Sequence, residues 1–258
     1  MKQFELKEVA KNVSKKIKSI RNTSYFNETP FQHFFIDEFF DELFANKLLN
    51  SFPDLDSPDW ERSNDPEIEI KMRSQWKSEF DCPEGISDAI RIMNSAPFLK
   101  ALSEALKIPK LIPDPYFTGG GLNVTVSGGL LDVHVDGNYH DASGLHRRVN
   151  AILYLNPGWQ EGWGGEFGMY DEKGDKLLKK IAPLHNRFMV FDTNDYSFHG
   201  LPDPLNFPKG HARRSIILYY YTKEPRPQSK IQVDAPHSAL WKKKGWTDKR
   251  GNKTRDFE

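Results

Sequence analysis

The stretch LLDVHVDGNYHD, residues 130–141, places a histidine and an aspartate two residues apart within a strand-like run. Side chains at positions i and i+2 of a β-strand point to the same face of the sheet. His134 and Asp136 should therefore project side by side. An imidazole and a carboxylate in this arrangement make half of a metal site, provided that a third ligand lies nearby.

The sequence around this stretch is rich in strand-like runs. From about residue 115, β-branched and aromatic runs alternate with turns that are rich in Gly, Pro, Asp and Asn. Six such runs follow one another with no helical pattern between them: GLNVTVSGG, LLDVHVD, RVNAILYLN, EFGMYD, RFMVFDT and RRSIILYYYT. This pattern predicts an antiparallel barrel or jelly roll rather than alternating βαβ units.

The segments on either side of the β-rich region have a different character. Residues 1–114 contain helical patterns, including a basic amphipathic stretch at the N-terminus and the run SAPFLKALSEALKI. Residues 223–258 are polar and end in a lysine-rich tail. We therefore expect a mainly β fold in a single domain, 1–258, whose core at 115–222 carries N-terminal helices and a C-terminal extension.

Composition and charge narrow the classes of function. Acidic and basic residues balance at 36 each, so no overall field favours a nucleic-acid partner. The single cysteine, Cys82, suits a reducing compartment and excludes cysteine-based zinc sites and iron–sulfur clusters. Neither a signal peptide nor a membrane-spanning segment is evident. These features predict a soluble, cytoplasmic protein whose basic N-terminal helix docks on its own core rather than on a membrane.

A third candidate ligand, His199, stands at the end of a strand-like run in NDYSFHGLPDP. Two imidazoles and one carboxylate on adjacent strands form the facial triad that holds Fe(II) and leaves positions open for substrate and oxygen. An isolated His-X-Asp occurs often by chance, and a lone histidine is more often satisfied by hydrogen bonds. The order of all three residues and their placement at strand ends favour the metal site.

A basic strand follows His199. Arg213 and Ser215 in RRSIILYYYT share one strand face, and Arg214 points the other way. An arginine inside a barrel is costly unless an anion meets its planar fork, so Arg213 indicates a carboxylate ligand. Taken alone, it could be a surface residue in a salt bridge. Together with the triad, it favours iron and a dicarboxylate.

The segment from about Gly119 to Thr222 resembles the 2-oxoglutarate- and Fe(II)-dependent oxygenase superfamily, in particular its prolyl-hydroxylase-like branch. The matching text is HVDGNYHDASGLHRRVNAILYLNPGWQEGWGGEFGMYD, then IAPLHNRFMVFDTNDYSFHGLPDP, then RRSIILYYYT. The resemblance implies a double-stranded β-helix core of the jelly-roll, cupin-like type. It also implies that His134, Asp136 and His199 bind the iron.

The same resemblance implies a pocket for 2-oxoglutarate. Arg213 matches the arginine that holds the distal carboxylate of this co-substrate, with Ser215 as an assistant. Tyr154 matches a tyrosine near the same carboxylate, although it could instead be a core tyrosine whose hydroxyl has a backbone partner. Strand alternation places Asn150 on that inward face, and Asn123 occupies a position that suits a co-substrate contact.

Further residues flank the expected site. In GWGGEFGMYD, Gly164 and Gly165 should let the chain turn sharply or pass close to another backbone at the barrel mouth. Arg147 and Arg148 could reach the substrate opening, but a solvated position at a charged strand end is the favoured interpretation. His140 lies in a turn-like stretch, which argues against a role as a metal ligand.

The resemblance implies an enzyme that uses Fe(II), 2-oxoglutarate and O2. It would hydroxylate an unactivated C–H bond, with desaturation or ring formation as alternatives, and convert 2-oxoglutarate to succinate. The substrate could be a peptidyl proline or a small biosynthetic intermediate, and the oligomeric state is left open. The rivals are a cupin-type metalloenzyme that does not use 2-oxoglutarate and a non-enzymatic jelly-roll binding module. Arg213 with Ser215 argues against the first rival, because its reactions need no clamp for a dicarboxylate.

Overall fold

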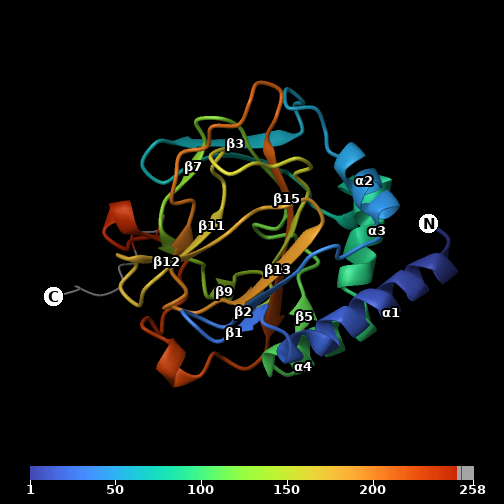
Figure 1. Ribbon diagram of the computed structural model, residues 1–258. Helices are drawn as coiled ribbons and strands as arrows, with labels where there is room; N and C mark the ends of the chain where they lie inside the picture. The colour runs from blue at the N-terminus through green and yellow to red at the C-terminus, as the bar shows by residue number, and fades with distance from the viewer. Residues whose placement is uncertain (249–250, 252–258) are drawn as a thin grey trace.

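The computed structural model describes residues 1–248 and residue 251. Its helices gather on one side of the β-sheets, at the right of Figure 1. They are α1 (Gln3–Ser19), α2 (Glu42–Asn50), α3 (Glu84–Met93) and α4 (Ala96–Leu106). Short 3-10 helices occur at Ile20–Asn22, Glu79–Asp81, Gln228–Lys230 and Lys242–Lys244, and the last two lie on the opposite side, at the left of Figure 1. The end of the expected lysine-rich tail, residues 249–250 and 252–258, lies outside the described residues.

Local sequence explains where two of these helices begin and end. The side chain of Asp41 accepts a hydrogen bond from the backbone N–H of Phe44 at 2.9 Å and so caps the start of α2. Pro97 lies in the first turn of α4, where a missing N–H costs nothing. The same helix ends at Lys107, which adopts the left-handed conformation with φ 55°.

Helix α1 packs against the rest of the protein along one face. Its buried side chains include Ala10, Val13 and Ile17, and all three belong to the main hydrophobic cluster of the protein. The helix therefore docks on the protein's own core, as the sequence predicts. No helix among the described residues has the length and apolar character needed to cross a membrane.

The larger sheet lies beneath the helices. Its strands are β1 (Phe26–Asn27), β2 (His33–Ile36), β3 (Trp60–Asp65), β4 (Glu69–Ser74), β5 (Ile112–Pro113), β6 (Gly121–Thr125), β7 (Leu130–Leu131), β9 (Tyr139–His140), β10 (Leu145–Tyr154), β13 (Arg187–Asp192) and β15 (Arg213–Thr222). The main order is β1-β2-β13-β10-β15-β6-β4-β3, and β5, β7 and β9 pair with β15, β4 and β10. One face of this sheet packs under the helices through the main hydrophobic cluster, which includes Ile216, Leu218 and Tyr220 of β15.

The smaller sheet faces the other side of the larger one. Its strands are β8 (His134–Val135), β11 (Phe167–Tyr170), β12 (Leu177–Ile181), β14 (His199–Gly200) and β16 (Leu240–Trp241), in the order β12-β11-β14-β8-β16. A second cluster joins the two sheets, with Ile152 and Met189 from the larger sheet and Phe167 and Met169 from the smaller one. Two antiparallel sheets around a shared core form the mainly β, double-stranded β-helix fold that the sequence predicts.

Both segments that flank the expected core also extend the sheets. From the N-terminal segment, β2 pairs with β13 and β4 pairs with β6, so residues 1–114 supply strands as well as helices. From the C-terminal segment, β16 pairs with β8. The C-terminal extension therefore lies directly beside the strand that carries His134.

Candidate metal and co-substrate site

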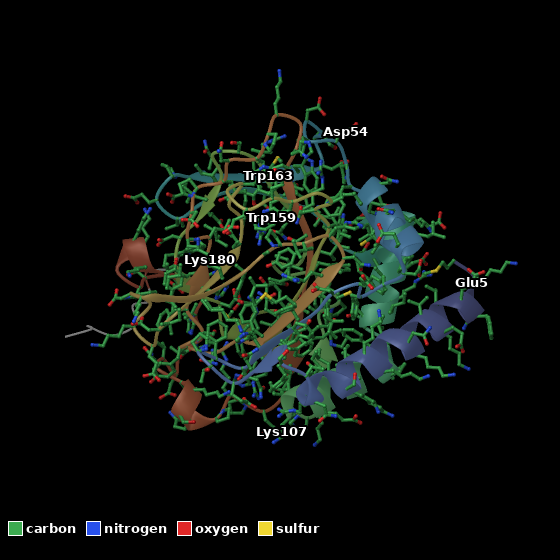
Figure 2. The ribbon with its side chains drawn as sticks, in the orientation of Figure 1. Glu5, Asp54, Lys107, Trp159, Trp163 and Lys180 are labelled. Carbon is green, nitrogen blue, oxygen red and sulfur yellow. The ribbon has the colours of Figure 1, made fainter. Side chains whose placement is uncertain are left out.

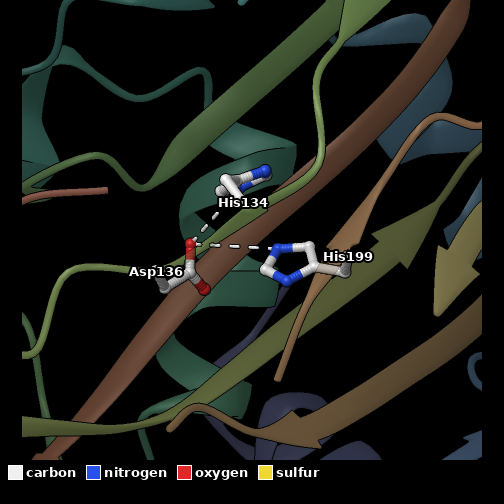
Figure 3. A group of neighbouring side chains, drawn as sticks. All are labelled: His134, Asp136 and His199. Carbon is white, nitrogen blue, oxygen red and sulfur yellow. Dashed lines mark ion pairs between the residues drawn. The ribbon is translucent and has the colours of Figure 1, made fainter. Parts of the chain in front are cut away.

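His134, Asp136 and His199 converge between the sheets, and all three are buried. His134 and His199 are direct partners across β8 and β14, and Asp136 follows β8. The Oδ1 atom of Asp136 lies 3.8 Å from Nε2 of His134 and 3.9 Å from Nε2 of His199, as the dashed lines in Figure 3 indicate. The structure thus brings together the three residues that the spacing of the sequence selects.

Backbone carbonyls determine which nitrogen of each histidine is available. His134 Nδ1 donates to the carbonyl of Asp132 at 2.9 Å, and His199 Nδ1 donates to the carbonyl of Ser197 at 2.8 Å. In both cases the partner lies two residues earlier in the chain. These bonds place the proton on Nδ1 and leave Nε2 with a free lone pair directed at the cluster, as a metal ligand requires.

Aromatic rings hold both imidazoles in place. Trp241 of β16 stacks on His134 with ring centroids 4.5 Å apart. Phe167 stacks on His199 at 5.0 Å, and Phe191 meets the same ring edge-on at 4.8 Å. Rings packed in this way lose little rotational freedom when a ligand binds, so the donor set is preorganised.

The charge states of the cluster suit a cation. Burial lowers the pKa of His134 to about 3, with a further contribution from His199, and burial also lowers the pKa of His199. Burial would raise the pKa of Asp136, but electrostatic interactions with His199, Arg147 and His134 outweigh it and lower that pKa. At neutral pH the cluster therefore offers two neutral imidazoles and one carboxylate.

The spacing of the donor atoms fits a single metal ion. A ligand atom lies about 2.1 Å from a transition metal in protein sites, so two ligands of one ion can be at most about 4.2 Å apart. The two nitrogen-to-carboxylate separations, 3.8 and 3.9 Å, satisfy this limit. All three ligand atoms lie within 4.8 Å of one another, so an ion needs only a small contraction to bind all three.

Asn150 of β10 fixes the carboxylate of Asp136. Its Nδ2 donates to Asp136 Oδ2 at 3.0 Å, which leaves Oδ1 facing the two histidines. The Oδ1 atom of Asn150 is buried and has no hydrogen-bond partner among the described residues. The sequence places Asn150 in the expected co-substrate pocket, and the structure places it against the carboxylate of the candidate metal site.

The predicted co-substrate residues form one rung across the larger sheet. Tyr154 of β10 is opposite Ser215 of β15, and Ser215 is opposite Asn123 of β6. Within the described residues, the buried Ser215 Oγ and Asn123 Nδ2 have no hydrogen-bond partner. Buried polar atoms are rarely left without partners, so this rung fits a polar ligand between the sheets.

Arg213 reaches this rung from the neighbouring position on β15. It is buried, its Nε donates to the carbonyl of Gly165 at 2.7 Å, and one terminal nitrogen donates to the hydroxyl of Tyr154 at 3.3 Å. It forms no ion pair with any described residue, although Glu166 is close enough for its charge to act on it. Burial lowers the pKa of Arg213, and no ion pair with a described residue offsets this effect. An anionic ligand would offset the free-energy cost of burying the positive charge.

Glycines of the loop before β11 allow this close approach. Gly165 has φ +85°, and a Cβ atom there would lie 2.9 Å from Cδ of Arg213. Gly164 has φ +72°, and a Cβ there would lie 2.7 Å from the carbonyl oxygen of Pro204. Trp159, labelled in Figure 2, donates from Nε1 to the carbonyl of Gly164 at 2.9 Å. The expected sharp turn and close backbone approach are both present.

Arg147 departs from the favoured sequence interpretation of a solvated strand end. It is partly buried in the wall of a cavity that also includes His134 and Asp136. The reason is a β-bulge, because the register of β10 against β15 shifts between Arg147 and Val149. One extra residue reverses the strand alternation, so Arg147 joins Asn150 on the inner face.

His140 lies outside the metal cluster, as expected. Its Nε2 is 3.0 Å from Asp114 Oδ1 and 3.1 Å from Thr118 Oγ1, and its Nδ1 accepts from the backbone N–H of Ser143 at 3.2 Å. Both ring nitrogens are therefore engaged, and the residue ties the loop before β6 to β9.

Fold and site together define a double-stranded β-helix protein with a two-histidine, one-carboxylate metal centre. Residues 120–221 match the model of the 2OG-Fe(II) oxygenase superfamily. Over this segment, which is less than half of its length, the chain is similar to the 2OG-Fe(II) oxygenases. The superfamily takes its name from Fe(II) and 2-oxoglutarate, and the donor set and the arginine rung fit both.

Curated relatives match the same part of the chain. Prolyl 3-hydroxylase OGFOD1 of Mus musculus is 28% identical over 104 residues, which are 38% of this chain and 19% of that protein. The Xenopus laevis protein of the same name is 29% identical over 106 residues, 38% of this chain and 20% of that protein. The chain therefore spans about a fifth of the length of the curated relatives it matches.

Solved structures share the fold over most of the chain. A prolyl hydroxylase from Trichoplax adhaerens, in complex with a peptide fragment of the hypoxia inducible factor oxygen degradation domain, has a TM-score of 0.59 and 18% identity. The match covers 86% of this chain and 94% of that one. A Pseudomonas putida prolyl-4-hydroxylase has a TM-score of 0.57 and 16% identity, covering 82% and 99%.

Proposed function

We propose that this chain is a 2-oxoglutarate- and Fe(II)-dependent dioxygenase that hydroxylates an unactivated C–H bond of its substrate. The observation that carries the proposal is the placement of the histidine–carboxylate triad in the same interior as Arg213, which has no carboxylate partner among the described residues. A metal site alone would not need that arginine. The pair of features supports a metal ion and a dicarboxylate together.

Each ligand has its own residues. His134, Asp136 and His199 would hold Fe(II), and Arg213 would hold the distal carboxylate of 2-oxoglutarate. Tyr154, Ser215 and Asn123 are the rung residues that would assist Arg213. When bound, iron and 2-oxoglutarate supply the oxidative chemistry, in which O2 is consumed, 2-oxoglutarate loses carbon dioxide to give succinate, and one oxygen atom enters the substrate C–H bond.

The chain's own contribution is to position these ligands. The carbonyls of Asp132 and Ser197 hold the histidine protons on Nδ1, and Asn150 keeps one oxygen of Asp136 directed at the metal. Rings packed on both histidines prevent their rotation and keep water from that side of the site. The carbonyl of Gly165 fixes the direction of the Arg213 fork. Positioning of this kind is what a protein adds to cofactor chemistry.

The substrate is a small molecule or a peptide, and hydroxylation of a prolyl residue is consistent with the name of the curated relatives, prolyl 3-hydroxylase. A carboxylate at position 136 supports hydroxylation, with desaturation or ring formation as alternatives. The free thiol of Cys82 supports a cytoplasmic location. Neither a nucleic acid nor a membrane is part of the proposal.

The rivals are a cupin-type metalloenzyme that does not use 2-oxoglutarate and a non-enzymatic binding module. A succinate assay separates them from the oxygenase. Protein loaded with Fe(II) without oxygen should form succinate from 2-oxoglutarate once oxygen is admitted, and Asp136→Ala should lose this turnover along with iron binding. Absence of succinate, combined with absence of 2-oxoglutarate binding by calorimetry, would reject the oxygenase.

A further inference from the structure

A cavity of about 360 Å³ lies on the open side of the triad, where a substrate would approach. His134 and Asp136 form part of its wall, and other parts come from β4, β10, β15 and the segment 236–241. Its volume is at the low end for small-molecule pockets. The cavity therefore suits a molecule the size of an amino acid.

The segment that closes one side of this cavity is firmly anchored. Asn138 donates from Nδ2 to the carbonyl of Ala235 at 3.0 Å and accepts from the backbone N–H of His237 at 2.9 Å. Next to it, a Cβ at Gly137 would lie 2.8 Å from the carbonyl oxygen of His237, so the backbones of these two segments are in close contact. A fixed wall at this position restricts the length of any chain that enters.

Three cations line the cavity, and they differ in their partners. Lys71 pairs with Glu69 at 2.9 Å, and Arg73 makes two hydrogen bonds to Glu61 at 2.8 and 2.7 Å. Arg147 forms no ion pair with any residue that the structure describes. It lowers the pKa of Asp136 through its charge, but of the three cations it is the one without an ion-pair partner among the described residues, so it can pair with an anionic ligand.

The contacts of Arg147 are all with neutral groups. It donates to the hydroxyl of Tyr221 at 3.2 and 3.1 Å and to the carbonyl of Thr118 at 3.4 Å, and its guanidinium lies 3.9 Å from the ring centroid of Tyr219. These contacts orient the guanidinium without neutralising it. The β-bulge of β10 directs it to the side of the cavity that carries Asp136.

We propose that the substrate is a free amino acid whose carboxylate binds Arg147, which places one of its C–H bonds at the metal. The proposal rests on the proposed oxygenase function and names its substrate class. Glu69, which pairs with Lys71, and Asp141 line the same cavity as the cations, so both signs of charge that a zwitterion needs are present. Ser238, on the anchored segment, adds a buried hydroxyl with no partner among the described residues.

A calorimetric comparison of acids and amides tests this assignment. Protein loaded with redox-inert Zn(II) is first titrated with 2-oxoglutarate and then, at saturation, with each common L-amino acid and its amide. At least one amino acid should bind, and its amide should bind at least about tenfold more weakly, because the amide cannot make a charge-assisted pair with arginine.

Two variants locate the contact. Arg147→Gln should weaken binding of that amino acid by at least about tenfold and leave binding of the amide unchanged. Arg73→Gln is the matched control, because it removes a cation of the same cavity that Glu61 already neutralises, and it should change binding by less than about threefold.

Each contrary result has its own meaning. Binding of 2-oxoglutarate without binding of any amino acid would overturn the inference and leave the oxygenase intact. Equal binding of acid and amide, equal losses in the two variants, or tighter binding of an N-acetylated, C-amidated proline peptide would overturn it too. Failure of 2-oxoglutarate to bind would overturn the proposed function and the inference with it.

Discussion

Two arginines on the inner face of the larger sheet, Arg213 and Arg147, are held by different kinds of group. Arg213 donates to the backbone carbonyl of Gly165 at 2.7 Å and reaches the hydroxyl of Tyr154 at 3.3 Å. Arg147 lies over the ring of Tyr219 at 3.9 Å and donates to a tyrosine hydroxyl. One is fixed by main chain and the other by side chains.

The difference suggests how one sheet can bind two kinds of ligand. The proposed co-substrate is always the same molecule, whereas the proposed substrate must be selected among similar ones. A backbone carbonyl moves only if the chain moves, so the fork of Arg213 has one direction, as the proposed co-substrate site requires. Tyrosine rings and hydroxyls can adjust, so Arg147 can meet ligands of different shape. The strand positions of the two arginines agree with this difference. Arg213 lies on the inner face by regular alternation, whereas Arg147 reaches the inner face only because of a β-bulge.

The largest effect should follow loss of the deeper arginine. Arg213→Gln removes one partner of a buried charge pair with 2-oxoglutarate, which costs about 2–5 kcal/mol, or at least about 30-fold in the Kd. Calorimetry with the Zn(II)-loaded protein measures it. Arg214→Gln is the matched control, since Arg214 is on the other face of β15, and it should bind 2-oxoglutarate as the wild type does. An unchanged Kd in Arg213→Gln would end the assignment of that residue.

A smaller effect on the same ligand should follow a change to the backbone support. Gly165→Ala adds a Cβ 2.9 Å from Cδ of Arg213 at a position with φ +85°. The arginine must shift, and we expect the Kd of 2-oxoglutarate to rise about tenfold. Gly158→Ala is the control, since its φ of +67° carries similar strain and no atom lies within 4 Å of the added Cβ. A similar Kd in both variants would mean that strain, not contact with Arg213, is responsible.

A change near Arg147, which lines the cavity beside the triad, should affect binding of the amino acid separately from binding of 2-oxoglutarate. Tyr221→Phe keeps the ring and removes the hydroxyl that accepts from Arg147. A neutral acceptor of this kind contributes about 1 kcal/mol, so binding of the amino acid should weaken about fivefold. The Kd of 2-oxoglutarate should stay within about twofold of wild type. A large loss of 2-oxoglutarate binding would show that the two arginines are coupled.

The smallest effect on ligands should come from a buried group whose partners are complete. His33 donates from Nδ1 to the carbonyl of Phe31 at 2.7 Å, and its Nε2 accepts from Lys179 at 3.1 Å. Burial is the main cause that lowers its pKa from 6.5 to about 4. His33→Asn should leave binding of both ligands unchanged, unlike a change at either arginine.

The same variant should change how stability depends on pH. Above pH 6.5 the imidazole is neutral in both states, whereas between about 4 and 6.5 only the unfolded chain binds the proton. Stability therefore falls as pH drops through this window, by up to about 3 kcal/mol from His33 alone. Denaturant unfolding at several pH values should show a shallower loss in His33→Asn than in the wild type. Equal slopes would mean that the histidine titrates normally in the folded state.

The sequence predicts the deeper half of the site better than the mouth. His134, Asp136, His199 and Arg213 lie on regular strands or at their ends, where alternation and chain order locate side chains. The cavity beside the triad depends on Arg147. A β-bulge places this residue on the opposite face of β10 from the one that strand alternation predicts, and the sequence pattern does not reveal the bulge. Strand alternation read from the sequence therefore assigns residues beyond a bulge to the wrong face of the sheet.

Contacts from distant parts of the chain were also beyond prediction. Trp241 lies in the C-terminal extension, and its stack on the ring of His134 follows from the pairing of β16 with β8. Asn150 was placed on the correct face by alternation, yet its partner, Asp136, belongs to a different sheet. The periodicity of the sequence cannot predict these contacts. It indicates the face of the sheet to which a side chain points, but not which other element packs against that face.

The pairing of β16 with β8 has a consequence for the order of biosynthesis. His134 leaves the ribosome long before Leu240 and Trp241, which supply the neighbouring strand and the ring that steadies the imidazole. A nascent chain that has reached only His199 contains all three candidate metal ligands but lacks β15 and β16. The candidate centre is thus completed late in translation, after β16 has been made.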